Sequence, residues 1–168
     1  MMKKFGWIVM LMAIFFAGSA QAQQTENSYV GSIGYQTEFQ RFGIQMQGRY
    51  QLCSVARLAP DVTFFFPKDQ VAGLDINLNL HYLIPIQKLT FYPLAGIGLQ
   101  TNFYGNSTIV NEQGVLRTLN ETGSHFAFNL GGGLSYPLSE NCFLNAETKF
   151  MIGNKHNLTF MIGVGHTF

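Results

Sequence analysis

The sequence predicts an all-β protein, an eight-stranded antiparallel up-and-down transmembrane β-barrel that follows a cleaved signal peptide. Three observations predict this fold. The chain begins with an export segment, its later segments alternate apolar and polar residues, and none of them reaches the roughly 18 consecutive apolar residues of a transmembrane helix. In lipid, only helices and closed barrels satisfy every backbone hydrogen-bonding group, so an exported chain of this kind fits a barrel.

Residues 1–22 have the organisation of a secretory signal peptide. Two lysines precede an apolar run from Phe5 to Ala17, and the small-residue tripeptide AQA that ends at Ala22 is a cleavage site. The run is about 13 residues long, whereas a membrane-spanning helix needs about 20. We therefore expect cleavage after Ala22 and one barrel domain over residues 23–168, with an uncleaved anchor as the alternative.

The composition of residues 23–168 favours contact with lipid. These 146 residues contain 8 basic and 9 acidic side chains, about half the charged fraction that is typical of soluble domains. Aromatic residues make up 14% of the full chain, and Phe alone occurs 16 times. So few basic residues argue against a nucleic-acid partner.

The first four predicted strands cover 28–38, 42–52, 54–66 and 71–83. The clearest alternation is GLDINLNLHYLI, in which Leu74, Ile76, Leu78 and Leu80 share one face and the residues between them are mostly Asn or Asp. Such alternation over about ten residues is typical of a membrane barrel strand. A short turn around Cys53 and Ser54 joins the second and third strands.

The last four predicted strands cover 88–103, 124–136, 142–152 and 157–168. Their short connections are IPIQK and PLSEN, whereas the polar segment 105–122 is long. An even strand number places both termini in the periplasm, with short turns there and longer loops outside. The stretches STIV and GVLRTL within 105–122 are β-prone; they either extend the fifth and sixth strands as a hairpin or belong to a mobile solvated loop.

The composition of the polar face decides which face is inside. A soluble barrel such as a lipocalin would need a charged outer face. Here the polar face carries mostly Asn, Gln, Ser, Thr and Gly, and small polar side chains suit the narrow interior of an eight-stranded barrel. We therefore expect the polar face to line the lumen and the apolar face to contact lipid.

This orientation predicts a network of charged side chains in the lumen. Unpaired buried charges cost several kcal/mol each, so carboxylates must lie close to the cations. We expect the arginines to pair with Glu147 and Asp61, and Lys149 to lie nearer Asp75; a selectivity ring in an open pore is the alternative. The network comprises Glu38, Arg49, Arg57, Asp61, Asp75, Glu147 and Lys149.

The whole pattern resembles the OmpX/OmpA-like group of small bacterial outer-membrane β-barrel proteins. The residues that carry the resemblance are the export segment, the eight amphipathic segments, the hairpin GLSYPLSENCFLNAETKF and the final GVGHTF. The resemblance implies an outer-membrane location, lipid as a partner, and recognition of the last strand by the barrel-assembly machinery. The residues that match this assembly signal are Phe160, Ile162, Val164 and Phe168.

For function, the resemblance implies surface interaction, adhesion or envelope integrity by a monomer with a filled lumen, with a surface partner at 105–122. The alternatives are a narrow porin-like channel and a lipid-modifying enzyme. A lipid A deacylase of this type uses a His-x-Ser pair and a downstream Glu on the membrane face, but His125 is followed at the second position by Ala127 and Glu147 is expected in the lumen. We therefore expect no enzymatic activity.

Cofactors and metals are not expected either, because the four histidines lack metal-ligand spacing. Cys53 and Cys142 would lie in an oxidising compartment, where a disulfide is common. Their predicted places, at the turn after the second strand and at the start of the seventh, are too far apart for a disulfide, which needs Cα atoms within about 7 Å. We expect them to be unbonded to each other.

Overall fold

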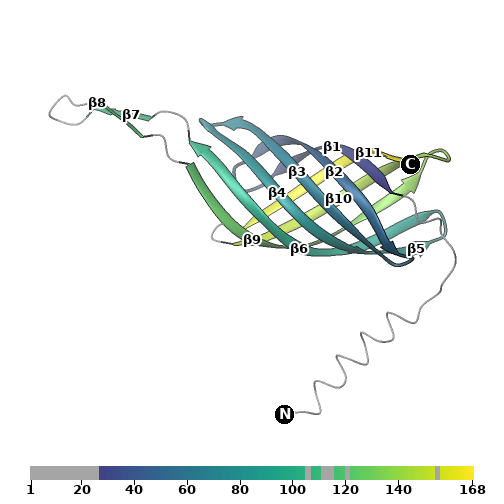
Figure 1. The fold of residues 1–168 in the computed structure, drawn as a ribbon. Helices are drawn as coiled ribbons and strands as arrows, with labels where there is room; N and C mark the ends of the chain where they lie inside the picture. The colour runs from purple at the N-terminus through teal and green to yellow at the C-terminus, as the bar shows by residue number, and fades with distance from the viewer. Residues whose placement is uncertain (1–26, 105–106, 111–115, 120–121, 154–155) are drawn as a thin grey trace, which may run out of the picture.

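The computed structural model is a closed β-barrel with one hairpin that projects beyond it (Figure 1). The structure describes residues 27–104, 107–110, 116–119, 122–153 and 156–168, so the expected signal peptide lies outside the described residues. No helix in these ranges is long and apolar enough to cross a membrane. The strands are β1 (Ser28–Gln36), β2 (Arg41–Cys53), β3 (Ala56–Lys68), β4 (Val71–Tyr82), β5 (Ile84–Ile86), β6 (Leu89–Tyr104), β7 (Ser107–Val110), β8 (Leu116–Leu119), β9 (Thr122–Pro137), β10 (Cys142–Gly153) and β11 (Asn157–Thr167).

Eight of these strands form the barrel wall, in the order β1, β2, β3, β4, β6, β9, β10 and β11. Pairing of β11 with β1 and of β4 with β6 closes the ring. The strand pairs can be followed from Gln47 on β2 around the ring in either direction. Through β1 and β11 the paired residue on β10 is Phe143, and through β3, β4, β6 and β9 it is Gly153, ten residues away. This stagger tilts the strands relative to the barrel axis, as Figure 1 shows. The predicted eight-stranded up-and-down barrel is confirmed.

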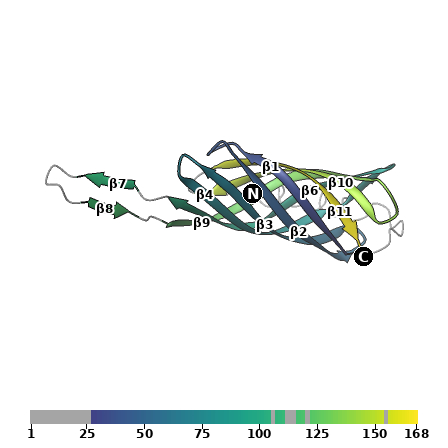
Figure 2. The same ribbon diagram turned by 90° about the horizontal axis from the view of Figure 1, so that it is seen from above.

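The two ends of the barrel differ. Both the start of β1 and the end of β11 lie at one end, together with the β2–β3 and β9–β10 turns; we call it the terminal end. The other end carries the β3–β4 turn, whose Asp69 and Gln70 have φ of 50° and 65°. Two consecutive positive φ values are the geometry of a tight type I′ hairpin turn. β7 and β8 project from this second end, which we call the hairpin end (Figure 2).

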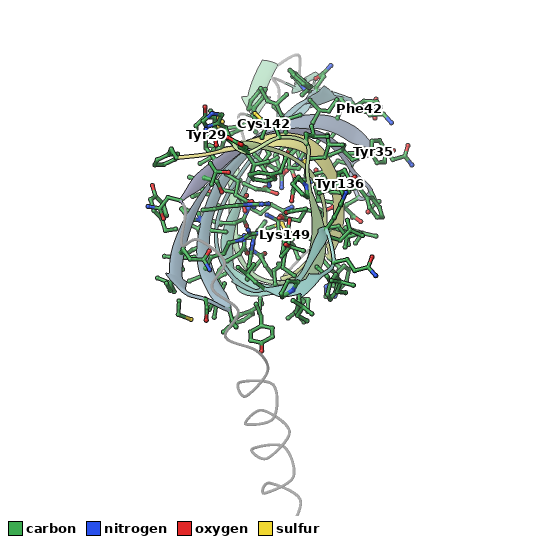
Figure 3. All side chains as sticks on the ribbon, turned by 90° about the vertical axis from the view of Figure 1, so that its right-hand side faces the viewer. Tyr29, Tyr35, Phe42, Tyr136, Cys142 and Lys149 are labelled. Carbon is green, nitrogen blue, oxygen red and sulfur yellow. The ribbon has the colours of Figure 1, made fainter. Side chains whose placement is uncertain are left out.

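The apolar side chains point outward and the polar side chains inward, as predicted. On β4, Leu78 is 43% exposed, whereas Asn77 and Asn79 beside it are 3% and 0% exposed. Viewed along the barrel, Tyr29, Tyr35 and Phe42 lie on the outer surface and Lys149 lies inside (Figure 3). A soluble container would have the reverse arrangement, so the lipocalin alternative is wrong.

Aromatic rings gather on the outer surface towards both ends. At the terminal end, Tyr29 stacks on His166 with ring centroids 5.6 Å apart and lies 6.1 Å from Phe168. Near the hairpin end, edge-to-face contacts join Tyr35 to Phe42 at 5.3 Å, and another joins the rings of Phe126 and Phe128. Two aromatic girdles that flank an apolar band are typical of barrels that sit in a membrane.

Three details differ from the sequence-based expectation. β1 ends at Gln36, so Glu38 lies exposed in the β1–β2 turn and is not a lumenal residue. The predicted turn IPIQK contains β5, which pairs with the start of β6. Within 105–122, β7 and β8 pair as a separate two-stranded sheet, which agrees with the predicted hairpin; the rest of that segment up to residue 121 lies outside the described residues.

Candidate functional site

The candidate site is the lumen, where polar side chains from the inward faces of the strands meet. Six of the seven residues predicted for the lumenal network are buried there, and Glu38 is the exception. Because an inward side chain occurs at every second position, one short strand segment supplies several neighbouring groups. The lumen contains three groups of contacts, one at the terminal end, one in the middle and one at the hairpin end.

At the terminal end, the side chain of Tyr92 is the centre of a hydrogen-bonded group that we call the Tyr92 cluster. The Tyr92 hydroxyl lies 2.7 Å from Asn145 Oδ1 and 3.0 Å from Glu147 Oε2, and it accepts a hydrogen bond from Arg49 Nη2 at 3.0 Å. Tyr92 is fully buried. A buried tyrosine hydroxyl needs such partners, and here it links β6 with β2 and β10.

Gly133 gives Tyr92 the room to lie inward. The two residues are paired across β6 and β9, and a Cβ atom at position 133 would collide with the Tyr92 ring and hydroxyl. The run GGG at 131–133 therefore contains one glycine that the packing of Tyr92 requires. Neither Tyr92 nor this need for glycine is predictable from strand alternation, because in the sequence Tyr92 is one more aromatic residue in a strand that contains several.

Arg49 bonds to side chains on both sides of the lumen. It donates to Gln47 Oε1 at 2.6 Å, to Asn145 Oδ1 at 2.7 Å and to Ser135 Oγ at 3.3 Å. Its guanidinium lies 4.0 Å from the Glu147 carboxylate. Since β2 and β9 stand on opposite walls, these bonds cross the lumen. Arg49 therefore lies next to Glu147, as predicted, although the two side chains are in electrostatic contact at 4.0 Å and not hydrogen-bonded.

Arg57 differs from the prediction that both arginines pair with carboxylates. Its Nε donates to His81 Nδ1 at 3.1 Å, and its guanidinium lies 4.6 Å from the centre of the Tyr92 ring. His81 stacks on the same ring, with centroids 4.5 Å apart. Arg57 and His81 face each other across β3 and β4, so the contact follows from strand register, which the sequence pattern leaves open.

In the middle of the lumen, Asp61 and Lys149 form an ion pair that crosses the barrel from β3 to β10. The Nζ–Oδ2 distance is 2.8 Å and both side chains are almost completely buried. Asn77 and Asn79 donate to the two Asp61 oxygens, each at 2.7 Å. These bonds satisfy the carboxylate, which a buried ion pair requires. The expectation that Lys149 lies nearer Asp75 is wrong: its hydrogen-bonded carboxylate is Asp61.

At the hairpin end, Arg41 is the centre of a third group, which we call the Arg41 cluster. Its guanidinium bonds to Gln36 on β1 and to Asn102 Oδ1 on β6, the latter at 2.7 Å. It also lies between the rings of Phe39 and Phe65, 4.4 and 5.1 Å from their centroids. Arg41 was not among the predicted lumenal residues, because it stands one residue before the predicted second strand, 42–52.

The four residues of the predicted assembly signal lie on the outer surface of β11 and at the end of the chain. Phe160, Ile162 and Val164 are exposed on one face of the strand, and Phe168 is 70% exposed. Phe168 continues the pairing beyond the strand, because its N–H donates to the Asn27 carbonyl at 2.9 Å. The four side chains would therefore contact lipid in a membrane.

The remaining candidate groups of the sequence are scattered. Cys53 and Cys142 are free thiols. Within the described ranges no three side chains of His, Cys, Asp or Glu are grouped as metal ligands would be. Glu147 lies in the lumen, away from the outer surface where the lipid A deacylase pattern would need it.

Comparisons with known proteins identify the fold. No protein-family model matches the sequence, and no curated protein matches it. Among solved structures, the N-terminal β-barrel domain of Pseudomonas aeruginosa OprF is similar with a TM-score of 0.63 and 23% identity, over 86% of this chain and 98% of that one. Neisserial surface protein A has a TM-score of 0.59 and 15% identity, over 85% and 96% of the two chains.

Ail, the attachment invasion locus protein of Yersinia pestis, is also similar. Its structure in complex with the heparin analogue sucrose octasulfate has a TM-score of 0.58 and 17% identity, over 86% of this chain and all of that one. At these identities the likeness establishes the fold. The chain has the fold of the small eight-stranded outer-membrane β-barrels, and the predicted resemblance to that group is confirmed at this level.

Proposed function

We propose that this protein is an integral protein of the bacterial outer membrane that acts in surface interaction through the β7–β8 hairpin. The observation that carries the proposal is the contrast between a barrel whose lumen is crossed by side-chain bonds and a two-stranded sheet that projects beyond the hairpin end. The predicted signal peptide and the short turns at the terminal end support an orientation with the terminal end in the periplasm and the hairpin outside.

The hairpin suits contact with another surface for a physical reason. In the part of the chain that the structure describes, β7 and β8 pair only with each other, so each has an outer edge of backbone N–H and C=O groups. Such edges can add a strand from a partner. The name of Ail, an attachment invasion protein with the same fold, supports surface attachment as the kind of function.

The test replaces residues 105–121 with a short Gly-Ser turn. We expect the variant to keep the heat-dependent gel mobility of a folded barrel, because the barrel strands are untouched. Cells that carry it should lose most of the surface attachment or cell–cell adhesion that the unaltered protein confers. Equal attachment at equal amounts of folded barrel would contradict the proposal.

The two alternative functions need separate measurements. A narrow channel would give conductance steps in a planar bilayer; we expect none, because Arg49 and the Asp61–Lys149 pair bond across the bore. A lipid-modifying enzyme would change the mass spectrum of lipid A when the protein is expressed; we expect no change, because Ala127 stands where the nucleophilic serine would be and is itself buried in the lumen.

We also propose that β11 carries the signal for the barrel-assembly machinery. Its outward residues Phe160, Ile162 and Val164 and the terminal Phe168 form an exposed row that is apolar except at His166, on a strand paired with β1 and β10. Phe168→Ala should lower the amount of folded barrel in the outer membrane several-fold, whereas Ile33→Ala, at a position 69% exposed on β1, should have little effect. Equal amounts of the two variants would exclude this role for Phe168.

A further inference from the structure

The outer surface of the barrel contains a large groove. It crosses β11, β1 and β2, has a volume of about 1010 Å³, and is lined almost entirely by apolar atoms. This volume is at the upper end of the range of about 300–1,000 Å³ that small-molecule sites occupy. The outward side chains along its sides are those of Ile33, Ile44, Phe160, Ile162 and Val164.

Gly31 on β1 forms the floor of the groove. It is paired with Val164 on β11 and with Met46 on β2, and a Cβ atom added to it would meet nothing within 4 Å on the outer face. The outward positions on either side of it, Tyr29 and Ile33, carry large exposed side chains. Glycine inside a strand often marks the close approach of a ligand, so the groove exists because one outward position lacks a side chain.

The end of the groove nearest the hairpin end is aromatic and then cationic. Tyr35, Phe42 and Phe66 line it, and the first two rings are 5.3 Å apart (Figure 3). Just beyond them, Lys68 Nζ donates to Gln40 Oε1 at 3.1 Å, and both side chains are exposed. Because Gln40 is two residues from Phe42, an apolar groove leads directly to an exposed ammonium group.

We propose that this groove binds one molecule of lipid A, with an acyl chain along Gly31 and a phosphate group at Lys68. The inference rests on the proposed orientation, which places the hairpin end in the outer leaflet, where the lipid is a phosphorylated and multiply acylated disaccharide. An acyl chain in the groove gains dispersion contacts that an empty groove lacks. A lysine at the membrane surface attracts anionic lipid headgroups.

The first test counts lipids that stay bound to the barrel. The protein is placed in phosphatidylcholine nanodiscs with a small fraction of lipid A, and native mass spectrometry measures the lipid retained after the disc is removed. We expect one lipid A per barrel, and several-fold less retention when phosphatidylglycerol replaces lipid A. Equal retention of phosphatidylglycerol would overturn lipid A as the occupant, and a dimer of barrels without lipid would assign the groove to a second copy of the chain.

A substitution in the floor assigns the lipid to the groove. Gly31→Leu fills the floor with a side chain and should lower the retention of lipid A about tenfold, because the acyl chain loses its contacts there. Ala95→Leu is the control, since it adds similar bulk at an exposed position of β6, on the opposite wall. The gel mobility shift shows whether both variants fold. Equal retention by the two variants would contradict the site.

A second pair of variants tests the phosphate contact. Lys68→Gln should lower the retention of lipid A about threefold, as expected for an exposed charge contact, and should have no effect on dephosphorylated lipid A. Lys88→Gln removes an equally exposed lysine outside the groove, between β5 and β6, and should retain lipid A in full. If Lys68→Gln and Lys88→Gln behave alike, Lys68 does not bind the phosphate.

A labelling experiment separates failure of this inference from failure of the proposed orientation. Glu38→Cys places a thiol in the exposed β1–β2 turn at the hairpin end, and a membrane-impermeant maleimide should label it in intact cells. The unaltered protein, with Cys53 exposed at the terminal end, should react only in opened cells. If Glu38→Cys also reacts only in opened cells, the proposed surface function and lipid A both fail. If it reacts in intact cells but lipid A is not retained, only the present inference fails.

Discussion

The two ends of the lumen are built in different ways. In the Tyr92 cluster, the Arg49 guanidinium, the Tyr92 hydroxyl and the Asn145 amide oxygen bond to one another and lie close to Glu147. Towards the hairpin end, buried polar atoms without a hydrogen-bond partner among the described residues are more numerous; they belong to Gln36, Gln45, Asp75, Gln100, Asn102, Asn157 and Thr159. Beside the Tyr92 cluster, Arg57 Nη2 and His81 Nε2 are the two such atoms.

The difference teaches where the barrel gains its stability. A fully satisfied polar network stiffens an interior, whereas a buried polar group without a partner costs about 1–3 kcal/mol. Such groups in native proteins usually bind water. We infer that the terminal end is the rigid part of the lumen and that the hairpin end is the part that admits water.

The largest expected effect separates the two clusters through their arginines. Arg49→Met leaves Glu147 buried without its cation and should lower the free energy of unfolding by about 3–5 kcal/mol. Arg41→Met removes amide hydrogen bonds, ring contacts and the cation beside Asp75. Because water admitted at the hairpin end can solvate that carboxylate, we expect a smaller loss of about 1–3 kcal/mol. Urea unfolding in lipid vesicles, followed by the gel shift, measures both; equal losses would show that the two ends do not differ.

A smaller effect is expected from the glycine under Tyr92. Gly133→Ala places a Cβ atom against the Tyr92 ring, and overpacking of this kind costs about 1–3 kcal/mol. Gly31→Ala is the matched control, because a Cβ there meets nothing within 4 Å on the outer face of β1. If the two substitutions reduce stability equally in the same urea experiment, the loss is a general property of glycine in strands and Tyr92 is not tightly packed.

Strand alternation was sufficient to predict the barrel and the orientation of its faces, because a period of two directly reports which side a residue takes. It also placed Asp61, Glu147 and Lys149 in the lumen. Alternation could not predict which of these charged side chains contact each other. Those contacts depend on the stagger of ten residues around the ring, and the sequence of a single strand does not determine this stagger. Glu38 was wrongly predicted to be lumenal because the apolar–polar alternation of the first strand continues beyond Gln36, where β1 ends and the turn begins.

The smallest expected effect is also the sharpest comparison, because it removes one hydroxyl from each end at nearly constant shape. Tyr92→Phe deletes a hydroxyl with three partners and should cost about 1–3 kcal/mol, since Asn145 and Arg49 lose a partner in a buried site. Thr159→Val deletes a buried hydroxyl that has no partner among the residues that the structure describes, and it should leave the free energy of unfolding unchanged or raise it by up to about 1 kcal/mol. If Thr159→Val lowered the free energy of unfolding as much as Tyr92→Phe, ordered water would satisfy the polar groups of the hairpin end as completely as side chains satisfy those of the terminal end. The proposed difference in rigidity between the two ends would then be wrong.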